Sequence, residues 1–410
     1  MSRIPEMRFD GFTEPWEQRK LGGILTERNV QHPQSKEFPL VSFTVENGVT
    51  PKTERYEREQ LVRGDKSIKK YKETRLNDIV YNPANLKFGA IARNKLGNAV
   101  FSPIYVTFDV NEIATPSFVE KLVTRNEFVQ RALQYQQGTV YERMSVNPED
   151  LCDLNVKIPS LEEQSKIGSF LDLIDNLITL HQRKYDRLKN LKKAYLEKMF
   201  PKNGEAVPEM RFEGFTEPWE QRKLGELLEF HNGFNGSSEK YGRGIPLISV
   251  MDILSNDFIT SENIRIKADL TEKEFQRFKV GYGDVLFQRS SENVEDAGTS
   301  NVYLDERKCA VFGGFVICGK KKAEYIPLFL KYGLTNKAVR AQITSKAQGA
   351  QHINVSQDTL QGTVILLPSQ YEQEKIGNYF RSIDALITLH QHKLERLKHL
   401  KQAYLQKMFA

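Results

Sequence analysis

Three short stretches hold residue types that DNA-modifying enzymes use for catalysis. Residues 82–85 read Asn-Pro-Ala-Asn, which lacks the second proline and the aromatic ring of the Asn-Pro-Pro-aromatic loop that holds a flipped base. Residues 281–283 read Gly-Tyr-Gly, which falls short of a glycine-rich cofactor loop. Residues 372–375 read Glu-Gln-Glu-Lys, but a metal-dependent nuclease needs a further acidic partner from an upstream strand, and none is suitably placed. The sequence therefore predicts no catalytic residue.

Metal-binding candidates are equally sparse. Cys152, Cys309 and Cys318 show neither metal-ligand spacing nor a paired framework, which is typical of a protein in a reducing cytoplasm. His181 and His390 occupy equivalent places in two related segments, where a metal site or a pH switch is one interpretation. We favour the other, that they are polar residues fixing the register of two packed helices. No metal site is expected.

These histidines belong to the two segments that organise the chain, residues 160–200 and 369–409. A constant shift of 209 superposes residues 163–200 on 372–409 without a gap. Apolar residues recur every seven positions and no proline interrupts either segment, so each is expected to form one unbroken helix with one apolar stripe. We expect the stripes to pack on each other through Ile167, Ile174, Leu177, His181, Leu188, Leu191, Ile376, Ile383, Leu386, His390, Leu397 and Leu400.

Connectivity predicts the direction of this pairing. Only a short polar stretch, residues 201–207, links the first helix to the next globular region, and that region runs directly into the second helix. The second helix should therefore begin where the first one ends. We predict an antiparallel coiled coil, with the end of the chain returning to its beginning.

A second repeat opens each globular region. Residues 5–22 return at 208–225 with one difference, Asp10 against Glu213. The regions that follow align only in patches, and they mix strand-like runs, such as IPLISVMDI at 245–253, with helical stretches near their ends. We predict an α+β protein with pseudo-twofold symmetry. Its segments are a first globular domain (1–159), a long helix (160–200), a linker (201–207), a second globular domain (208–368) and a long helix (369–410).

Composition bounds the class of protein. At 410 residues the chain is long enough for two or three domains, and its net charge of +6 permits a polyanionic partner without requiring one. No run of 18 apolar residues occurs, and the N-terminus does not resemble a signal peptide. We therefore expect a soluble cytoplasmic protein without membrane contact.

Phrases that recur in the two halves carry a resemblance to a known family. EPWEQRKLG opens each half, GDVLFQRS lies in the second domain, and the halves close on IPSLEEQSKIGSFLDLIDNLI and LPSQYEQEKIGNYFRSIDALI. Together they resemble the DNA-specificity subunit of type I restriction-modification enzymes, over essentially the whole chain. The most specific part is the proline, Glu-Gln, Lys-Ile, apolar-Asp-apolar-Ile phrase, which occurs twice at the expected distance.

The resemblance implies that each globular domain reads one half of a bipartite site in double-stranded DNA. The two long helices would set the spacing between half-sites and bind two methyltransferase subunits. Those subunits would carry S-adenosylmethionine, and restriction and motor subunits, with ATP and Mg²⁺, would join them for cleavage. The chain itself would bind no cofactor and hold no active site.

Candidates for DNA contact follow from this interpretation, because phosphate anchoring uses Lys and Arg while base reading also uses amides. In the first domain they are Lys66, Lys69, Lys70, Lys72, Arg75, Asn82, Asn85, Lys87, Arg93, Asn94 and Lys95. In the second they are Gln288, Arg289, Ser290, Asn293, Lys320, Lys321, Lys322, Gln351 and His352. Any single lysine is alternatively an ordinary solvated charge.

Alternatives stay open at this level. A specificity subunit of a type IIB or IIG system would share the same design. A scaffold protein, whose coiled coil assembles partners and whose domains bind peptides, would show salt-tolerant partner binding and no DNA sequence preference. An enzyme acting alone is disfavoured by the missing motifs.

Overall fold

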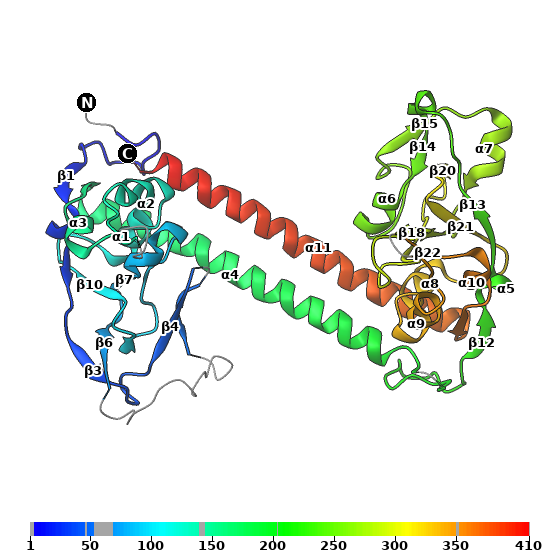
Figure 1. Cartoon of the computed structure of the whole chain (residues 1–410), viewed down its shortest axis with the longest axis horizontal. Helices are drawn as coiled ribbons and strands as arrows, with labels where there is room; N and C mark the ends of the chain where they lie inside the picture. Colours follow the sequence, from blue (N-terminus) through cyan, green and yellow to red (C-terminus); the bar gives the residue numbers. More distant parts are fainter. Residues whose placement is uncertain are drawn as a thin grey trace. The chain divides into compact units, whose positions relative to one another are not determined.

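A computed structural model of the chain describes residues 4–45, 47–52, 69–138, 144–202, 204–349 and 352–409. The chain divides into two compact units, Met1–His181 with Lys393–Ala410, and Gln182–His392. Each unit joins a globular α+β domain to parts of two 38-residue helices, α4 (Leu161–Lys198) and α11 (Gln370–Lys407), which confirms the α+β class (Figure 1). No helix of the described residues is long and apolar enough to cross a membrane.

The first domain is built on a four-stranded antiparallel sheet in the order β2 (Leu25–Glu27), β10 (Val106–Val110), β7 (Ile79–Tyr81) and β8 (Ile91–Arg93). Every residue of β7 is buried, so this strand reads as a short apolar run rather than an alternating one. A second sheet has the order β3 (Gln31–Pro33), β6 (Lys70–Thr74) and β9 (Ala99–Phe101), and β4 (Val41–Thr44) and β5 (Gly48–Pro51) form a hairpin. Among the described residues of this domain, 3-10 turns form η1 (Leu21–Gly23) and η4 (Pro83–Phe88).

The helical stretch expected near the end of the first domain is divided in two. Helix α1 (Pro116–Val123) ends at Thr124, whose hydroxyl donates to the Glu120 carbonyl oxygen at 2.7 Å, and α2 (Asn126–Leu133) begins two residues later. A short helix, α3 (Pro148–Cys152), precedes β11 (Asn155–Ile158), which pairs antiparallel with β1 (Glu17–Lys20). The N-terminal repeat is thereby paired with the strand that leads into α4.

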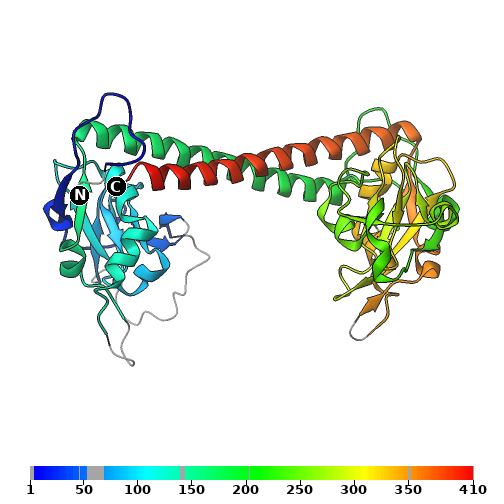
Figure 2. The same cartoon turned by 90° about the horizontal axis from the view of Figure 1, so that it is seen from above.

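The second domain has a four-stranded antiparallel sheet of the same order, β13 (Leu228–Asn232), β21 (Val316–Lys321), β17 (Val285–Gln288) and β19 (Ser300–Val302). Its other strands are β12 (Glu220–Lys223) with β23 (Val364–Leu367), β18 (Ser290–Ser291) with β22 (Ile353–Asn354), and a mixed sheet of β15 (Ile266–Ala268), β14 (Tyr241–Ile248), β20 (Ala310–Phe312) and β16 (Lys279–Val280). In Figure 2, β22 projects from the body of this unit.

Short helices complete the second domain: α5 (Leu224–Leu227), η5 (Ser238–Lys240), α6 (Val250–Ser255), α7 (Glu272–Phe278), α8 (Pro327–Gly333), α9 (Lys337–Thr344) and α10 (Gln357–Gln361). The interpretation of residues 245–253 as one strand-like run was wrong in its second half, which forms α6. Asp252 explains the change, because its carboxylate accepts hydrogen bonds from the Ser249 amide at 2.8 Å and from the Ser249 hydroxyl at 2.6 Å, capping the helix.

The Glu-Gln phrase fixes the beginning of α4 to its own domain. Glu163 is buried, and its carboxylate accepts hydrogen bonds from Arg8 Nε at 2.8 Å and Nη2 at 2.6 Å. The Gln164 side chain accepts from the Thr115 amide at 2.9 Å and donates to the Pro159 carbonyl oxygen at 2.9 Å. Because a buried carboxylate or amide is costly unless it is hydrogen-bonded, these partners account for both residue types.

The second unit repeats this arrangement at α11. Glu372 accepts two hydrogen bonds from Arg211, both at 2.7 Å. Gln373 accepts from the Ile326 amide at 3.0 Å and donates to the Pro368 carbonyl oxygen at 2.9 Å. The repeated Glu-Gln phrase therefore forms the joint between each long helix and its domain.

A glycine in each long helix lets the domain approach closely. A Cβ at Gly168 would lie 2.9 Å from Ser117 Cβ and 3.0 Å from the Phe118 nitrogen. At Gly377 the corresponding distances are 2.9 Å to Leu328 Cβ and 3.0 Å to the Phe329 nitrogen. Both glycines thus sit against the first turn of a short helix, α1 or α8.

Each unit also holds the end of the other long helix. In the first unit Phe409 packs on Phe118 and Trp16, with ring centroids 5.2 and 6.0 Å apart, and the Met7 amide donates to the Lys407 carbonyl oxygen. In the second unit Phe200 packs on Phe329 and Trp219 at 5.4 and 5.8 Å. The Met210 amide donates to the Lys198 carbonyl oxygen in the same way.

The buried stripe of the long helices differs from the expected one. Ile167, Ile174, Ile376 and Ile383 are buried and Leu397 is partly buried, while His181, Leu188 and His390 are half-buried. The prediction was wrong for Leu177, Leu191, Leu386 and Leu400, which are exposed. The stripe turns instead through Leu171 and Ile178, because α4 must face the domain core as well as α11.

Candidate nucleic-acid interface

Some of the predicted contacts in the first domain are accessible. Lys69 and Lys70 are exposed at the start of β6, and Asn85 and Lys87 are exposed on η4. The Lys87 ammonium lies 5.0 Å from the centroid of the exposed Phe88 ring. These side chains can reach a ligand without rearrangement. Lys66 lies outside the described residues.

Other predicted contacts in this domain are committed to the fold. The ammonium of buried Lys72 donates to Glu27 at 2.8 Å and to Asn29 at 3.1 Å. Asn82 is buried and caps η4 by accepting from the Ala84 amide. These two residues are therefore withdrawn from the DNA-contacting set, because neither side chain faces solvent.

Arg93 and Asn94 are withdrawn for the same reason. The Arg93 guanidinium donates to Glu120 at 3.0 Å and to Asp172 at 2.6 Å, which joins β8 to α1 and α4. Asn94 is fully buried, and its amide donates to the Gly97 and Arg75 carbonyl oxygens. Two neighbours are exposed but paired, Lys95 with Glu120 at 2.8 Å and Arg75 with Glu73 at 2.5 Å.

In the second domain, Arg289 lines a cavity of about 680 Å³. The cavity lies where β13 and β22 meet the end of α9, and β18 pairs with β22 directly after Arg289. None of the described residues that line it carries a carboxylate. They supply two cations, four amides and three hydroxyls, together with two aliphatic side chains: Arg289, Lys346, Asn232, Gln348, Asn354, Gln357, Ser345, Ser356, Thr359, Ile317 and Val355.

This chemistry suits a nucleic acid. Guanidinium and ammonium groups bind phosphates, and amides pair with base edges. Of the predicted residues, Arg289 and Ser290 are brought to this region, and exposed His352 lies in the hairpin of β22. Gln351 lies outside the described residues.

The remaining predictions in the second domain are placed elsewhere or held internally. Lys320, Lys321 and Lys322 lie at the opposite end of β21 from Arg289, because β17 pairs Gln288 with Val316. Gln288 is buried, and its amide donates to the Ser290 carbonyl oxygen at 2.9 Å. Asn293 is exposed, and its amide group donates to Asp296 at 2.7 Å within its own loop.

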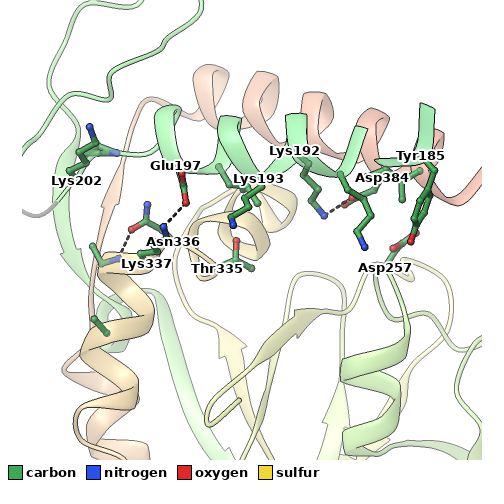
Figure 3. A pocket seen from close by; sticks show the side chains of 16 residues that line it. Tyr185, Lys192, Lys193, Glu197, Lys202, Asp257, Thr335, Asn336, Lys337 and Asp384 are labelled. Atoms are coloured by element: carbon green, nitrogen blue, oxygen red, sulfur yellow. Dashed lines mark hydrogen bonds and ion pairs between the residues drawn. The ribbon is translucent and has the colours of Figure 1, made fainter. Parts of the chain in front are cut away.

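A different cavity, of about 860 Å³, lies in the second unit between α4 and the loop that joins α8 to α9 (Figure 3). Two of the five lysines that line it pair with carboxylates of the same cavity: Lys192 with Asp384 at 2.5 Å, and Lys337 with Glu197. Asp257 lines it as well. Because both signs of charge line this cavity, it is less suited to a polyanion than the one at Arg289.

The aspartate that opens the strand shared by both domains has a structural role. Asp78 accepts from Arg28 at 2.8 and 3.0 Å, and Asp284 accepts from the Gly281 and Lys321 amides at 2.9 and 2.8 Å. Burial raises the pKa of both carboxyl groups. Neither faces the candidate interface, and no group of three His, Cys, Asp or Glu in the described chain could hold a metal.

Sequence reasoning missed most of the cavity at Arg289. Asn232, Lys346, Gln348, Asn354 and Gln357 come from β13, the segment after α9, β22 and α10, and no local cluster marks them. They are brought together at the cavity only by the order in which the strands pair. A weak signal was present in the sequence, since Gln348 and Gly349 align with Gln137 and Gly138 of the first domain.

Comparison with known proteins agrees with this architecture. A family model described as "Type I restriction modification DNA specificity domain" matches residues 13–190 and again 216–399. The EcoKI specificity subunit of Escherichia coli K12 is 20% identical over 275 residues, covering 65% of this chain and 59% of that protein. The MjaVIII specificity subunit of Methanocaldococcus jannaschii is 21% identical, covering 61% of this chain and 60% of that protein.

Solved structures share the fold. The S subunit of a type I restriction-modification system from M. genitalium superposes with a TM-score of 0.63 at 13% identity, covering 100% of this chain and 99% of that one. A chain from a structural study of assembly and conformational transition of the type I R-M system superposes with a TM-score of 0.50 at 21% identity, covering 96% and 97%. With both halves matched by the family model, the chain belongs to the type I restriction-modification DNA specificity family.

Proposed function

We propose that this chain is the specificity subunit of a type I restriction-modification system, with each domain reading one half of a bipartite DNA site. The observation that carries this proposal is the repetition of one domain frame around two different exposed surfaces. The first domain offers Lys69, Lys70, Asn85 and Lys87, whereas the second offers the polar cavity at Arg289. Two domains that share one fold but expose different side chains suit a protein that reads two unlike half-sites of cytoplasmic DNA.

We also propose that α4 and α11 form an antiparallel coiled coil with pseudo-twofold symmetry, which sets the distance between the half-sites. Equivalent contacts in the two units support this. Asp175 pairs with Lys401 at 2.6 Å, and Asp384 pairs with Lys192 at 2.5 Å. The Phe170 and Tyr404 rings lie 4.8 Å apart, and Tyr379 and Tyr195 lie 5.5 Å apart. Each contact maps on its counterpart by the same shift of 209.

The long helices would also bind two methyltransferase subunits. Exposed leucines on them occur as pairs related by the shift of 209: Leu177 and Leu386, Leu180 and Leu389, Leu191 and Leu400. Exposed apolar residues that lie side by side are typical of partner surfaces, and Leu177 and Leu180 are three residues apart on one helix, as are Leu386 and Leu389. Two copies of one surface would bind two copies of one partner. Those partners would supply S-adenosylmethionine and the methylation chemistry, and restriction subunits would supply ATP- and Mg²⁺-dependent cleavage, so this chain would be non-catalytic.

The decisive experiment expresses the chain with its methyltransferase subunit and maps modified adenines across a genome. We expect one motif with two unlike halves separated by a fixed gap. Exchanging residues 23–159 for another domain of the same frame should change one half only. Modification without sequence preference, or a change in both halves, would contradict the proposal.

Inserting a helical segment into both long helices tests the proposed spacer. If α4 and α11 set the distance, matched insertions should lengthen the gap between half-sites and leave the halves unchanged. An unaltered gap would show that the distance is set elsewhere. The control carries the same number of residues in the linker near residue 203, where no change of gap is expected.

A further inference from the structure

The turn between β20 and β21 presents an aromatic side chain to solvent from a backbone that is held firmly. Phe315 is 70% exposed, the largest exposed fraction among the large apolar side chains of the described chain. The turn is fixed by hydrogen bonds from the Gly313 amide to the Ile248 carbonyl oxygen at 2.9 Å and from the Arg289 amide to the Phe315 carbonyl oxygen at 2.9 Å. A Cβ at Gly314 would lie 1.7 Å from Asn235 Oδ1, so the turn has no room for another side chain.

The first domain presents an apolar side chain at the same place. The sequence Ala-Val-Phe forms β9 at 99–101 and β20 at 310–312, and the gap-free alignment that continues from it sets Ile104 against Phe315. Ile104 is 59% exposed. Single exposed apolar residues are common on protein surfaces. Recurrence at one turn of two domains whose other loops have diverged is not expected from chance exposure.

The surroundings of Phe315 are those of a nucleic-acid contact. Arg289 Nη1 donates to the Gly314 carbonyl oxygen at 3.4 Å, so the guanidinium lies at the base of the turn. The same residue lines the carboxylate-free cavity, and Ile317 lines it two residues beyond Phe315. The turn that carries Phe315 is therefore hydrogen-bonded to a cationic residue that also lines the amide-rich cavity.

We propose that Phe315 and Ile104 are apolar wedges, each of which inserts at one base step of the half-site read by its own domain. Apolar side chains that enter between base pairs unstack the step and bend the duplex. The cost depends on the step, being smallest at flexible pyrimidine–purine steps, so a wedge contributes specificity without hydrogen-bonding to a base. The inference rests on the proposed function and adds a means of reading shape to it.

The test uses the complex of this chain with its methyltransferase subunit and a duplex carrying the modified motif. The fluorescent base 2-aminopurine replaces one base at a time in the half-site assigned to the second domain, because its emission rises when stacking is lost. With the wild type, we expect 2-aminopurine emission to rise at one base step. With Phe315→Ala, we expect no rise at that step. Affinity for the cognate duplex should fall about tenfold, as expected for the loss of one stacking contact, and Phe315→Trp should retain both signals.

Two controls separate the wedge from other causes of brightening. The partner's flipping of its target adenine also unstacks a base, and that signal should persist in Phe315→Ala. Tyr282→Ala removes another exposed aromatic ring, near the opposite end of β17, and should alter neither signal. Ile104→Ala should darken a step in the other half-site only.

The outcomes distinguish this inference from the proposed function. If the wild-type complex binds its motif but no step depends on Phe315, the wedge is wrong and DNA recognition stands. If Phe315→Ala keeps the wild-type rise in 2-aminopurine emission at every step, the proposal that Phe315 inserts is likewise wrong. If the wild-type complex shows no sequence preference for any duplex, the proposed function fails first.

Discussion

The two junctions between a long helix and its domain are built on one plan but use different chemistry. In the first unit, the ammonium of buried Lys121 lies 2.8 Å from Asp172 and 2.5 Å from Asp175. In the second unit, Tyr332 takes the aligned position, and its hydroxyl donates to Asp384 at 2.8 Å. The ammonium donor that the first domain supplies is thus replaced in the second domain by a neutral hydroxyl donor.

The difference shows which contacts are interchangeable. Asp175 and Asp384 are equivalent, and each keeps a lysine from the other long helix, Lys401 or Lys192. What changes is the partner from the domain. The helix-to-helix contact is therefore repeated because both units need it, whereas the helix-to-domain contact only has to satisfy a buried carboxylate, which either a cation or a hydroxyl achieves.

Substitutions at the arginine–glutamate pair, which both junctions share, should cause the largest losses of stability, and the losses should be similar in the two units. Arg8→Ala leaves Glu163 buried without its partner, and Arg211→Ala does the same to Glu372. Each should destabilise its own unit by about 3–5 kcal/mol, the usual result of breaking a buried ion pair. Hydrogen exchange read by mass spectrometry, unit by unit, measures this. Arg243→Ala breaks an exposed pair with Asp269 and should cost less than about 1 kcal/mol; an equal loss in Arg8→Ala would refute the anchoring role.

The diverged part should show unequal effects. Lys121→Met leaves Asp172 and Asp175 without the ammonium they share, so we expect about 3 kcal/mol of destabilisation in the first unit. Tyr332→Phe removes one hydrogen bond to a carboxylate, so we expect about 1.5 kcal/mol in the second unit. Denaturant titration of each variant gives the comparison. If Tyr332→Phe proves the more damaging, the Lys121 ammonium and the Tyr332 hydroxyl are not alternatives of the kind described.

The same contrast explains what the sequence could predict. Helix α4 was expected from residues 160–200 and spans Leu161–Lys198, because heptad spacing and the absence of proline are local signals. The DNA-facing set was less predictable. Arg93 looked like a free cation, yet its partners Glu120 and Asp172 stand 27 and 79 residues away. Likewise, no local pattern joins Asn232 to Gln357 in one cavity.

Acid should weaken the first junction more than the second. Although burial opposes ionisation, hydrogen bonds from Lys121 and Ser117 and the charge of Arg93 lower the pKa of Asp172 to about 2. A carboxyl pKa lower in the folded than in the unfolded state, where it is about 3.9, stabilises the fold above that pH and loses this contribution as pH falls toward 2. The first unit should lose up to about 2 kcal/mol between pH 4 and pH 2 from this group. Asp172→Asn should flatten that part of the profile, and an unchanged profile would remove Asp172 as its source.

Raising the pH above 8 should stabilise the second junction, by less than acid destabilises the first. Burial lowers the pKa of Lys331 to about 8. The positive charge of Lys192 adds to this decrease, and the negative charges of Asp384 and Asp257 oppose it. The unfolded chain holds this proton up to about pH 10.4. Between the two values the unfolded state binds more protons, so stability should rise with pH. We expect a gain of about 1 kcal/mol, because the ammonium is partly solvated.

Exchange protection of the second unit, followed from pH 8 to pH 10, would measure this gain. The first unit provides an internal reference, since Glu120 takes the aligned position there in place of a lysine. Lys331→Met should be more stable than the wild type at pH 8, and the difference should close by pH 10. A second unit that loses protection as pH rises, or a Lys331→Met variant that keeps the wild-type slope, would show that the partly buried Lys331 ammonium does not destabilise this junction.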